Sequence, residues 1–101
     1  MSEREAALAA LEERLDATVD ALCALARIPG VSADGFDRAE LERSARAVAE
    51  LLRKAGLERV EVLELPGAHP YVVGEWLRAA RGAPTVLIYA HHDVQPPGRP
   101  E

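Results

Sequence analysis

Three side chains capable of metal chemistry stand together near the end of the sequence: His91, His92 and Asp93. A neutral imidazole is a good zinc ligand, and a nearby carboxylate can orient the ring or add negative charge beside the metal. Residues i and i+2 of a strand point the same way, so we expect His91 and Asp93 to share a face and His92 to point to the other side. The residues alone also allow a solvated surface turn in which Asp93 caps backbone amides.

The element that would position this cluster is the unbroken apolar run Thr85–Ala90, which Pro84 opens. Such a run predicts a strand buried on both faces. Ligands of open α/β sheets bind at the carboxyl ends of the strands, where His91 and Asp93 would lie. A strand buried on both faces needs layers on both sides and neighbours on both edges, so we expect it to be central in a larger sheet.

Two helices are predicted before the strands. The first begins at a capping box, Ser2-x-x-Glu5, and ends before Pro29, which cannot continue a helix. Its apolar face consists of Leu8, Leu11, Leu15, Val19, Leu22 and Leu25. The second begins at a second capping box, Asp37-x-x-Glu40, and ends at Gly56, which favours the left-handed conformation of a helix cap.

The hydrophobic period changes from 3.6 to 2 after the second helix. Val60 and Val62 alternate with charged residues and predict a half-exposed strand. A second strand is predicted over 71–77, with Gly74 as a bulge or a point of close approach. With Thr85–Ala90 as the third, we expect an α/β fold of two N-terminal helices packed on three strands.

The overall composition excludes several classes of function. A net charge of −5 argues against nucleic acid as a partner, because phosphate binding needs a basic surface. No polybasic cluster, signal peptide or apolar run long enough to span a bilayer is visible, so we expect no membrane association. The single cysteine, Cys23, forbids an internal disulfide and is typical of a reducing compartment, so the expected location is the cytoplasm.

The sequence TVLIYAHHDVQP, residues 85–96, resembles the first metal-binding signature of the aminoacylase/carboxypeptidase/dipeptidase family of zinc exopeptidases (peptidase family M-twenty). That signature is an apolar strand, a small residue and then H-x-D-V-x-P. The segment RIPGVS, residues 27–32, is similar to the family's end of the first helix, so the resemblance covers nearly the whole chain. Residues 93–97 favour the dipeptidase branch. Ala90 replaces the family's usual glycine, and His92 occupies the variable middle position.

This resemblance implies a function and assigns the site residues. His91 would be a ligand of one zinc ion, in an enzyme that holds two, and Asp93 would hold the ligand geometry and assist catalysis. The substrate would be a small peptide or an N-acyl amino acid, and a homodimer is compatible with the full-length form. The bridging aspartate, the Glu-Glu pair and the other ligands would lie beyond Glu101. Residues 1–101 are therefore expected to be the N-terminal part of a catalytic domain, inactive alone.

Two other classes of function remain as alternatives. One is a non-catalytic α/β module that keeps the scaffold without a complete metal site. The other is a different hydrolase, such as an amidohydrolase or a phosphoesterase, but those families typically present H-x-H or D-x-H on the first strand instead of H-x-D.

Overall fold

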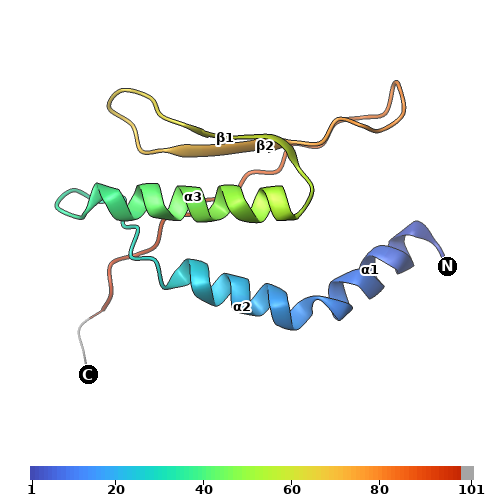
Figure 1. Ribbon diagram of the computed structural model, residues 1–101, viewed down its shortest axis with the longest axis horizontal. Coiled ribbons are helices and arrows are strands. Elements are labelled where there is room, and N and C mark those ends of the chain that lie inside the picture. Colours follow the sequence, from blue (N-terminus) through green and yellow to red (C-terminus); the bar gives the residue numbers. More distant parts are fainter. Residues whose placement is uncertain (99–101) are drawn as a thin grey trace.

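The computed structural model describes residues 1–98. Three helices precede two strands: α1 (Glu3–Glu13), α2 (Leu15–Ala26), α3 (Arg38–Lys54), β1 (Glu58–Leu63) and β2 (Tyr71–Glu75). The β-hairpin, α3 and α2 form successive layers (Figure 1), in which α3 contacts both strands and α2 contacts only helices. The mixed α/β class is as expected, but only one of the helices packs on the sheet.

The first predicted helix is divided into two. Its start is confirmed, because both hydrogen bonds of the capping box are present: the Glu5 amide donates to the Ser2 hydroxyl oxygen, and the Ser2 amide donates to the Glu5 carboxylate. Arg14 then leaves helical geometry, with φ −100° and ψ 4°, and separates α1 from α2. Neither helix contains a buried residue. Four leucines of the predicted apolar face, Leu8, Leu11, Leu15 and Leu22, are 48–64% exposed, and Leu25 is half-buried. Most of the stability of a helix in a protein comes from packing of its apolar face against other elements. The stretch around Arg14 has little such packing, which is consistent with the break there.

The second predicted helix is present as α3, with the ends that its sequence indicates. The side chain of Asp37 accepts a hydrogen bond from the amide of Ala39 at 2.9 Å, so the cap at Asp37 is confirmed. The predicted capping box is not formed, because the Glu40 carboxylate pairs with Arg43 at 2.9 Å instead of reaching back to Asp37. At the other end Gly56 has φ +94°, and Leu57 donates its amide to the carbonyl of Leu52 at 3.0 Å, which is a Schellman cap. Helix α3 also supplies most of the small core. That core comprises Ile28, Val31, Leu41, Ala45 and Ala49, with Ser44 as its one buried polar residue.

Strands β1 and β2 pair antiparallel and lie on α3. Exposed and half-buried residues alternate along β1, as the period of two predicts. The register is irregular between Glu58 and Glu61, where Arg59 has a positive φ of 48°. Gly74 is a point of close approach, because an added Cβ would lie 3.3 Å from side-chain atoms of Leu52, Leu57 and Val60. This prediction for Gly74 is confirmed.

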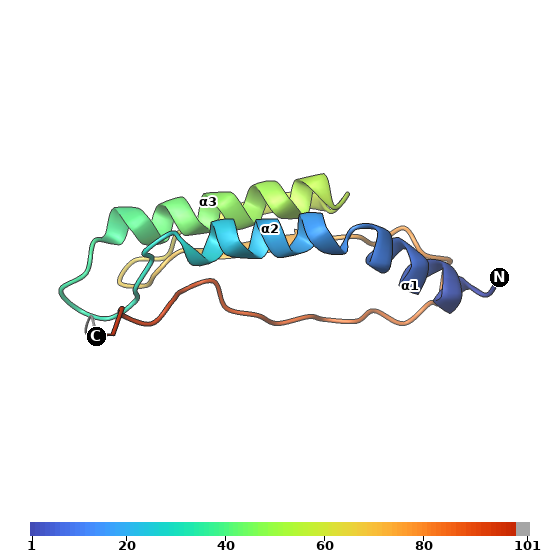
Figure 2. The same ribbon diagram turned by 90° about the horizontal axis from the view of Figure 1, so that it is seen from below.

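The third predicted strand, Thr85–Ala90, is not formed within residues 1–98. The segment has no ladder partner there, since β1 and β2 pair only with each other, and Figure 2 shows it running beside the helices, set apart from them. Val86, Leu87, Ile88 and Tyr89 are 79–94% exposed, so neither face of this segment is buried within residues 1–98. The segment stays exposed because a buried strand needs a neighbouring strand to pair with and a layer of side chains to cover its faces. Residues 1–98 supply neither for this segment.

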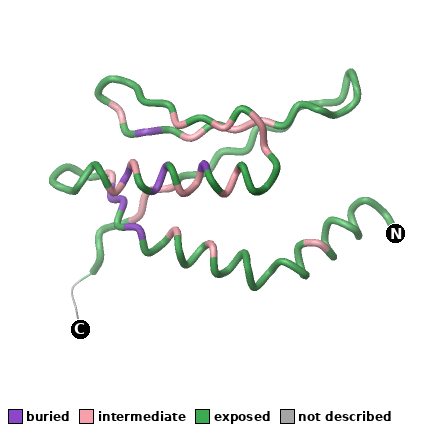
Figure 3. Tube along the Cα trace, viewed as in Figure 1, coloured by how far each residue is buried: buried purple, intermediate pink, exposed green. Residues whose placement is uncertain are grey.

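The buried residues lie mostly at one end of the molecule. Figure 3 shows them on α3, on the loop that follows α2 and at the residue before β2. None of the helices described in residues 1–98 is long and apolar enough to cross a membrane.

Candidate functional site

The segment that carries the two histidines docks at the buried end of the molecule. The amide of Val94 donates to the carbonyl of Gly30 at 3.0 Å. The hydroxyl of Ser44, on α3, donates to the carbonyl of His92 at 3.1 Å. Residues 91–94 are thus attached both to the loop after α2 and to α3, whereas the apolar run before them is exposed.

His91 and Asp93 form a hydrogen-bonded pair. Nδ1 of His91 lies 2.8 Å from Oδ1 of Asp93 and 3.1 Å from the Asp93 carbonyl oxygen. Both oxygens are acceptors, so Nδ1 carries the proton, and in the neutral ring Nε2 keeps its lone pair. The His91 side chain is 76% exposed, and within residues 1–98 no group is hydrogen-bonded to Nε2. The predicted shared face of these two residues is confirmed.

The Asp93 carboxylate is held from its other side by Ser32. The Ser32 hydroxyl donates to Oδ2 of Asp93 at 2.6 Å. This hydrogen bond, with a smaller contribution from His91, holds the pKa of the Asp93 carboxyl below its ordinary value. Asp93 therefore stays ionised in mildly acidic solution, where a carboxylate can still orient a histidine ring.

His92 points away from the pair, as strand alternation predicts. Its Nε2 lies 3.1 Å from the carbonyl oxygen of Pro70, so Nε2 donates there. In the neutral ring Nδ1 is then an acceptor, 3.0 Å from the hydroxyl of Ser44, so this hydroxyl shares its one proton between Nδ1 and the His92 carbonyl. Ser44 is 2% exposed. Both ring nitrogens are engaged by the protein, so His92 fastens the segment and is less suited than His91 to bind a metal.

Three residues at this site were not identified from the sequence. Ser32 lies in the RIPGVS segment, which the family resemblance includes but to which it assigns no role. Ser44 is a small residue on the apolar face of α3, and nothing in the pattern distinguishes it. His69, for which no spacing indicates a role, donates from Nε2 to the carbonyl of Ser32 at 2.9 Å.

The donor set is chemically suited to zinc but small. A histidine whose Nδ1–H is held by a carboxylate presents Nε2 in the orientation that zinc sites use. A catalytic zinc generally takes three protein ligands and a water. Within residues 1–98, no three His, Cys, Asp or Glu side chains are grouped closely enough to hold a metal ion.

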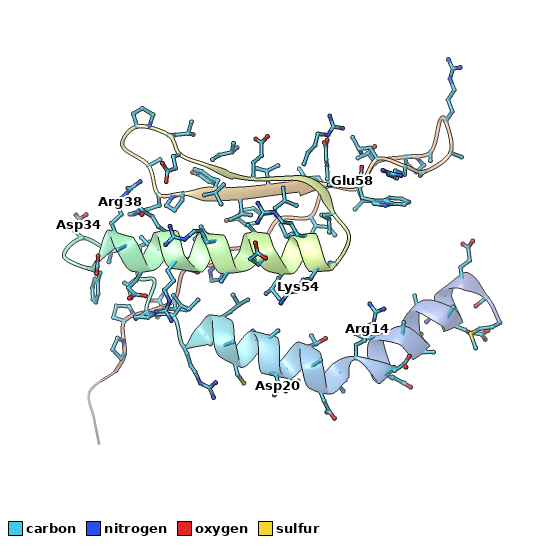
Figure 4. All side chains as sticks on the ribbon, in the orientation of Figure 1. Arg14, Asp20, Asp34, Arg38, Lys54 and Glu58 are labelled. Carbon is cyan, nitrogen blue, oxygen red and sulfur yellow. The ribbon has the colours of Figure 1, made fainter. Side chains whose placement is uncertain are left out.

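Away from the histidine segment, a concave region lies between α2 and α3. It is a crevice of about 330 Å³ lined mainly by apolar residues, among them Leu25, Ile28 and Leu51. Lys54 points from α3 toward α2 at its edge (Figure 4). Neither His91 nor Asp93 lines this crevice, and the charged residues that do line it are Glu50 and Lys54.

Comparison with protein-family models, with curated proteins and with solved structures finds no match to this chain.

Proposed function

We propose that this chain is the N-terminal part of the catalytic domain of a zinc-dependent, dipeptidase-like exopeptidase or amidase. In this proposal His91 binds one of two zinc ions through Nε2, and Asp93 orients His91 and assists catalysis. The substrate is a small peptide or an N-acyl amino acid. Residues 1–101 alone are inactive, because the general base and the other ligands come from further sequence.

The observation that carries the proposal is the hydrogen-bonded pair itself. The H-x-D spacing alone does not require contact, yet Nδ1 of His91 lies 2.8 Å from Oδ1 of Asp93. The pair fixes the tautomer with the lone pair on the exposed nitrogen, which is the form that coordinates a metal. The hydrogen bond from the Ser32 hydroxyl lowers the pKa of the Asp93 carboxyl and so favours the charged form that accepts the Nδ1 proton of His91.

Bound zinc would supply a water of lowered pKa and polarise the scissile carbonyl. The chain's own contribution is to hold His91 in one tautomer, to hold Asp93 in its charged form, and to fasten both to α3 and to the loop after α2 through His92 and Val94.

The first test is the reading frame and the protein that it encodes. We expect sequence beyond Glu101 to contain an aspartate and an adjacent Glu-Glu pair. The longer protein should hydrolyse dipeptides or N-acyl amino acids only when loaded with zinc. Replacing His91→Ala should remove one zinc, measured by metal analysis, together with most of the activity. Asp93→Asn should keep the metal site but lose about 10–100-fold in affinity or activity.

Three results would contradict the proposal. A longer His91→Ala protein that keeps two zinc ions and full hydrolysis would show that the ligand assignment is wrong. Tight stoichiometric zinc binding by residues 1–101 would show a self-sufficient site. A reading frame that stops at Glu101, with a stably folded product, would favour the non-catalytic α/β module instead.

A further inference from the structure

We infer that Ser32 is a positioning residue for the His91–Asp93 pair: its hydroxyl sets the rotation of the Asp93 carboxylate, and through it the tautomer and direction of the His91 ring. The inference rests on the proposed role of His91 as a metal ligand. Ser32 touches neither a metal nor a substrate in this proposal, and it acts only through Asp93.

The two oxygens of Asp93 are divided between two partners. Oδ2 accepts from Ser32 at 2.6 Å, and Oδ1 accepts from His91 at 2.8 Å. The terminal torsion of an aspartate is soft, so one hydrogen bond to an exposed histidine cannot fix the plane of the carboxylate. The His91 side chain is 76% exposed and that of Asp93 34% exposed, which leaves Ser32 as the contact that ties the pair to the rest of the fold.

Ser32 can serve this purpose because its own backbone is held on both sides. Its carbonyl accepts a hydrogen bond from His69 at 2.9 Å. The preceding residue, Val31, is 3% exposed. One residue further back, Gly30 accepts the amide of Val94 at 3.0 Å. The loop after α2 and the histidine segment are therefore joined by two hydrogen bonds. The bond from the Val94 amide to the Gly30 carbonyl docks the segment, and the bond from the Ser32 hydroxyl orients the Asp93 carboxylate.

The geometry also limits the size of the effect. The carbonyl oxygen of Asp93, 3.1 Å from Nδ1 of His91, is a second acceptor for the same proton. Without the Ser32 hydroxyl this carbonyl still favours the Nδ1–H tautomer to some extent. Removal of the hydroxyl should therefore shift the tautomer balance several-fold toward Nε2–H and should not abolish the Nδ1–H form.

The experiment compares the wild-type 101-residue chain with Ser32→Ala and Ser32→Thr. Nitrogen NMR of the histidine rings is recorded about two pH units above the ordinary histidine pKa of about 6.5, where an ordinary imidazole is neutral. We expect the Nδ1–H form of His91 in the wild type, a several-fold fall in the ratio of Nδ1–H to Nε2–H in Ser32→Ala, and recovery in Ser32→Thr, which restores a hydroxyl. Titration with Zn²⁺, followed at the same resonances, should show affinity at His91 falling about tenfold in Ser32→Ala.

Amide exchange of Val94 separates positioning from simple loss of structure, because it reports the docking bond to Gly30. An unchanged His91 tautomer in Ser32→Ala would overturn the inference. So would a tautomer change that is accompanied by loss of Val94 protection, since the segment would then have undocked. A tautomer that depends on Ser32, found together with a longer His91→Ala protein that keeps two zinc ions and full hydrolysis, would support the positioning role and contradict the proposed function.

Discussion

Replacing Ser44→Ala is the sharpest test of how the histidine segment is held. Ser44 is 2% exposed, and its hydroxyl donates to the carbonyl of His92 at 3.1 Å while lying 3.0 Å from Nδ1 of the same residue. An added Cβ at Gly30 would lie 3.3 Å from the Cβ of Ser44, so the loop after α2 packs against that carbon. Alanine keeps this carbon and removes only the oxygen.

The magnitude follows from what the lost hydroxyl leaves behind. A net intramolecular hydrogen bond contributes about 0.5–1.5 kcal/mol, and a buried polar group left without a partner costs about 1–3 kcal/mol. His92 is only half-buried, so water can reach part of the exposed carbonyl and ring, which argues for the lower part of that range. Alanine is also a better helix former than serine by a few tenths of a kcal/mol. We expect a net loss of about 1–1.5 kcal/mol, or about 4–12 °C in Tm for a chain of this size.

The assay is urea unfolding followed by far-UV circular dichroism, with Arg46→Ala as the control. Arg46 is an exposed residue on the same helix, so its replacement should change the free energy of unfolding by less than about 0.5 kcal/mol. A double-mutant cycle with His92→Ala, which keeps the His92 carbonyl, should give a coupling energy of about 1 kcal/mol for the contact of the His92 ring with Ser44. If Ser44→Ala is as stable as the wild type, or the coupling is zero, the docking of His92 on α3 has been misinterpreted.

Two further predictions concern Asp93 and the apolar run. Because the pKa of Asp93 is lowered in the folded state, its hydrogen bonds stabilise the fold fully above the ordinary aspartate value of about 3.9, and this contribution is lost as the pH falls through the lower folded pKa. Urea unfolding at a series of acidic pH values should therefore show a steeper loss of stability for the wild type than for Asp93→Asn, and equal slopes would contradict this. Leu87 is 94% exposed, so Leu87→Lys should change the free energy of unfolding of the 101-residue chain by less than about 0.5 kcal/mol, whereas a loss above about 1 kcal/mol would mean that another segment covers it.

Features that depend on neighbours in sequence could be predicted from the sequence. The capping box at Ser2, the cap at Asp37 and the left-handed Gly56 each depend on residues within one helical turn, and the structure has all of them. The alternation along β1 is similarly local, since successive side chains of a strand point to opposite faces. The break at Arg14 could not be predicted, because the apolar spacing continues through it and only the lack of a packing partner distinguishes the site.

The predicted strand Thr85–Ala90 shows the limit of the same method. An apolar run indicates that a segment will be buried when a partner is present, but it contains no information on whether the partner is in the same chain. Within residues 1–98 the hairpin strands pair with each other, and the run stays exposed. The contacts of Ser32 with Asp93 and of Ser44 with His92 were beyond prediction for a related reason, since they join residues 61 and 48 positions apart.

The candidate site nevertheless forms without the strand that was expected to position it. The separation of His91 from His92 needs only an extended backbone, in which side chains i and i+2 point the same way whether or not a ladder is present. What a sheet would add is rigidity, and here part of that rigidity comes from His92, whose ring is fastened between Ser44 and Pro70 on the opposite side of the segment. His92, the middle residue of H-x-D that the motif leaves variable, therefore anchors the segment in this chain. By fixing the back of the segment, His92 presents His91 and Asp93 at its front, and Ser32 then sets the orientation of the carboxylate.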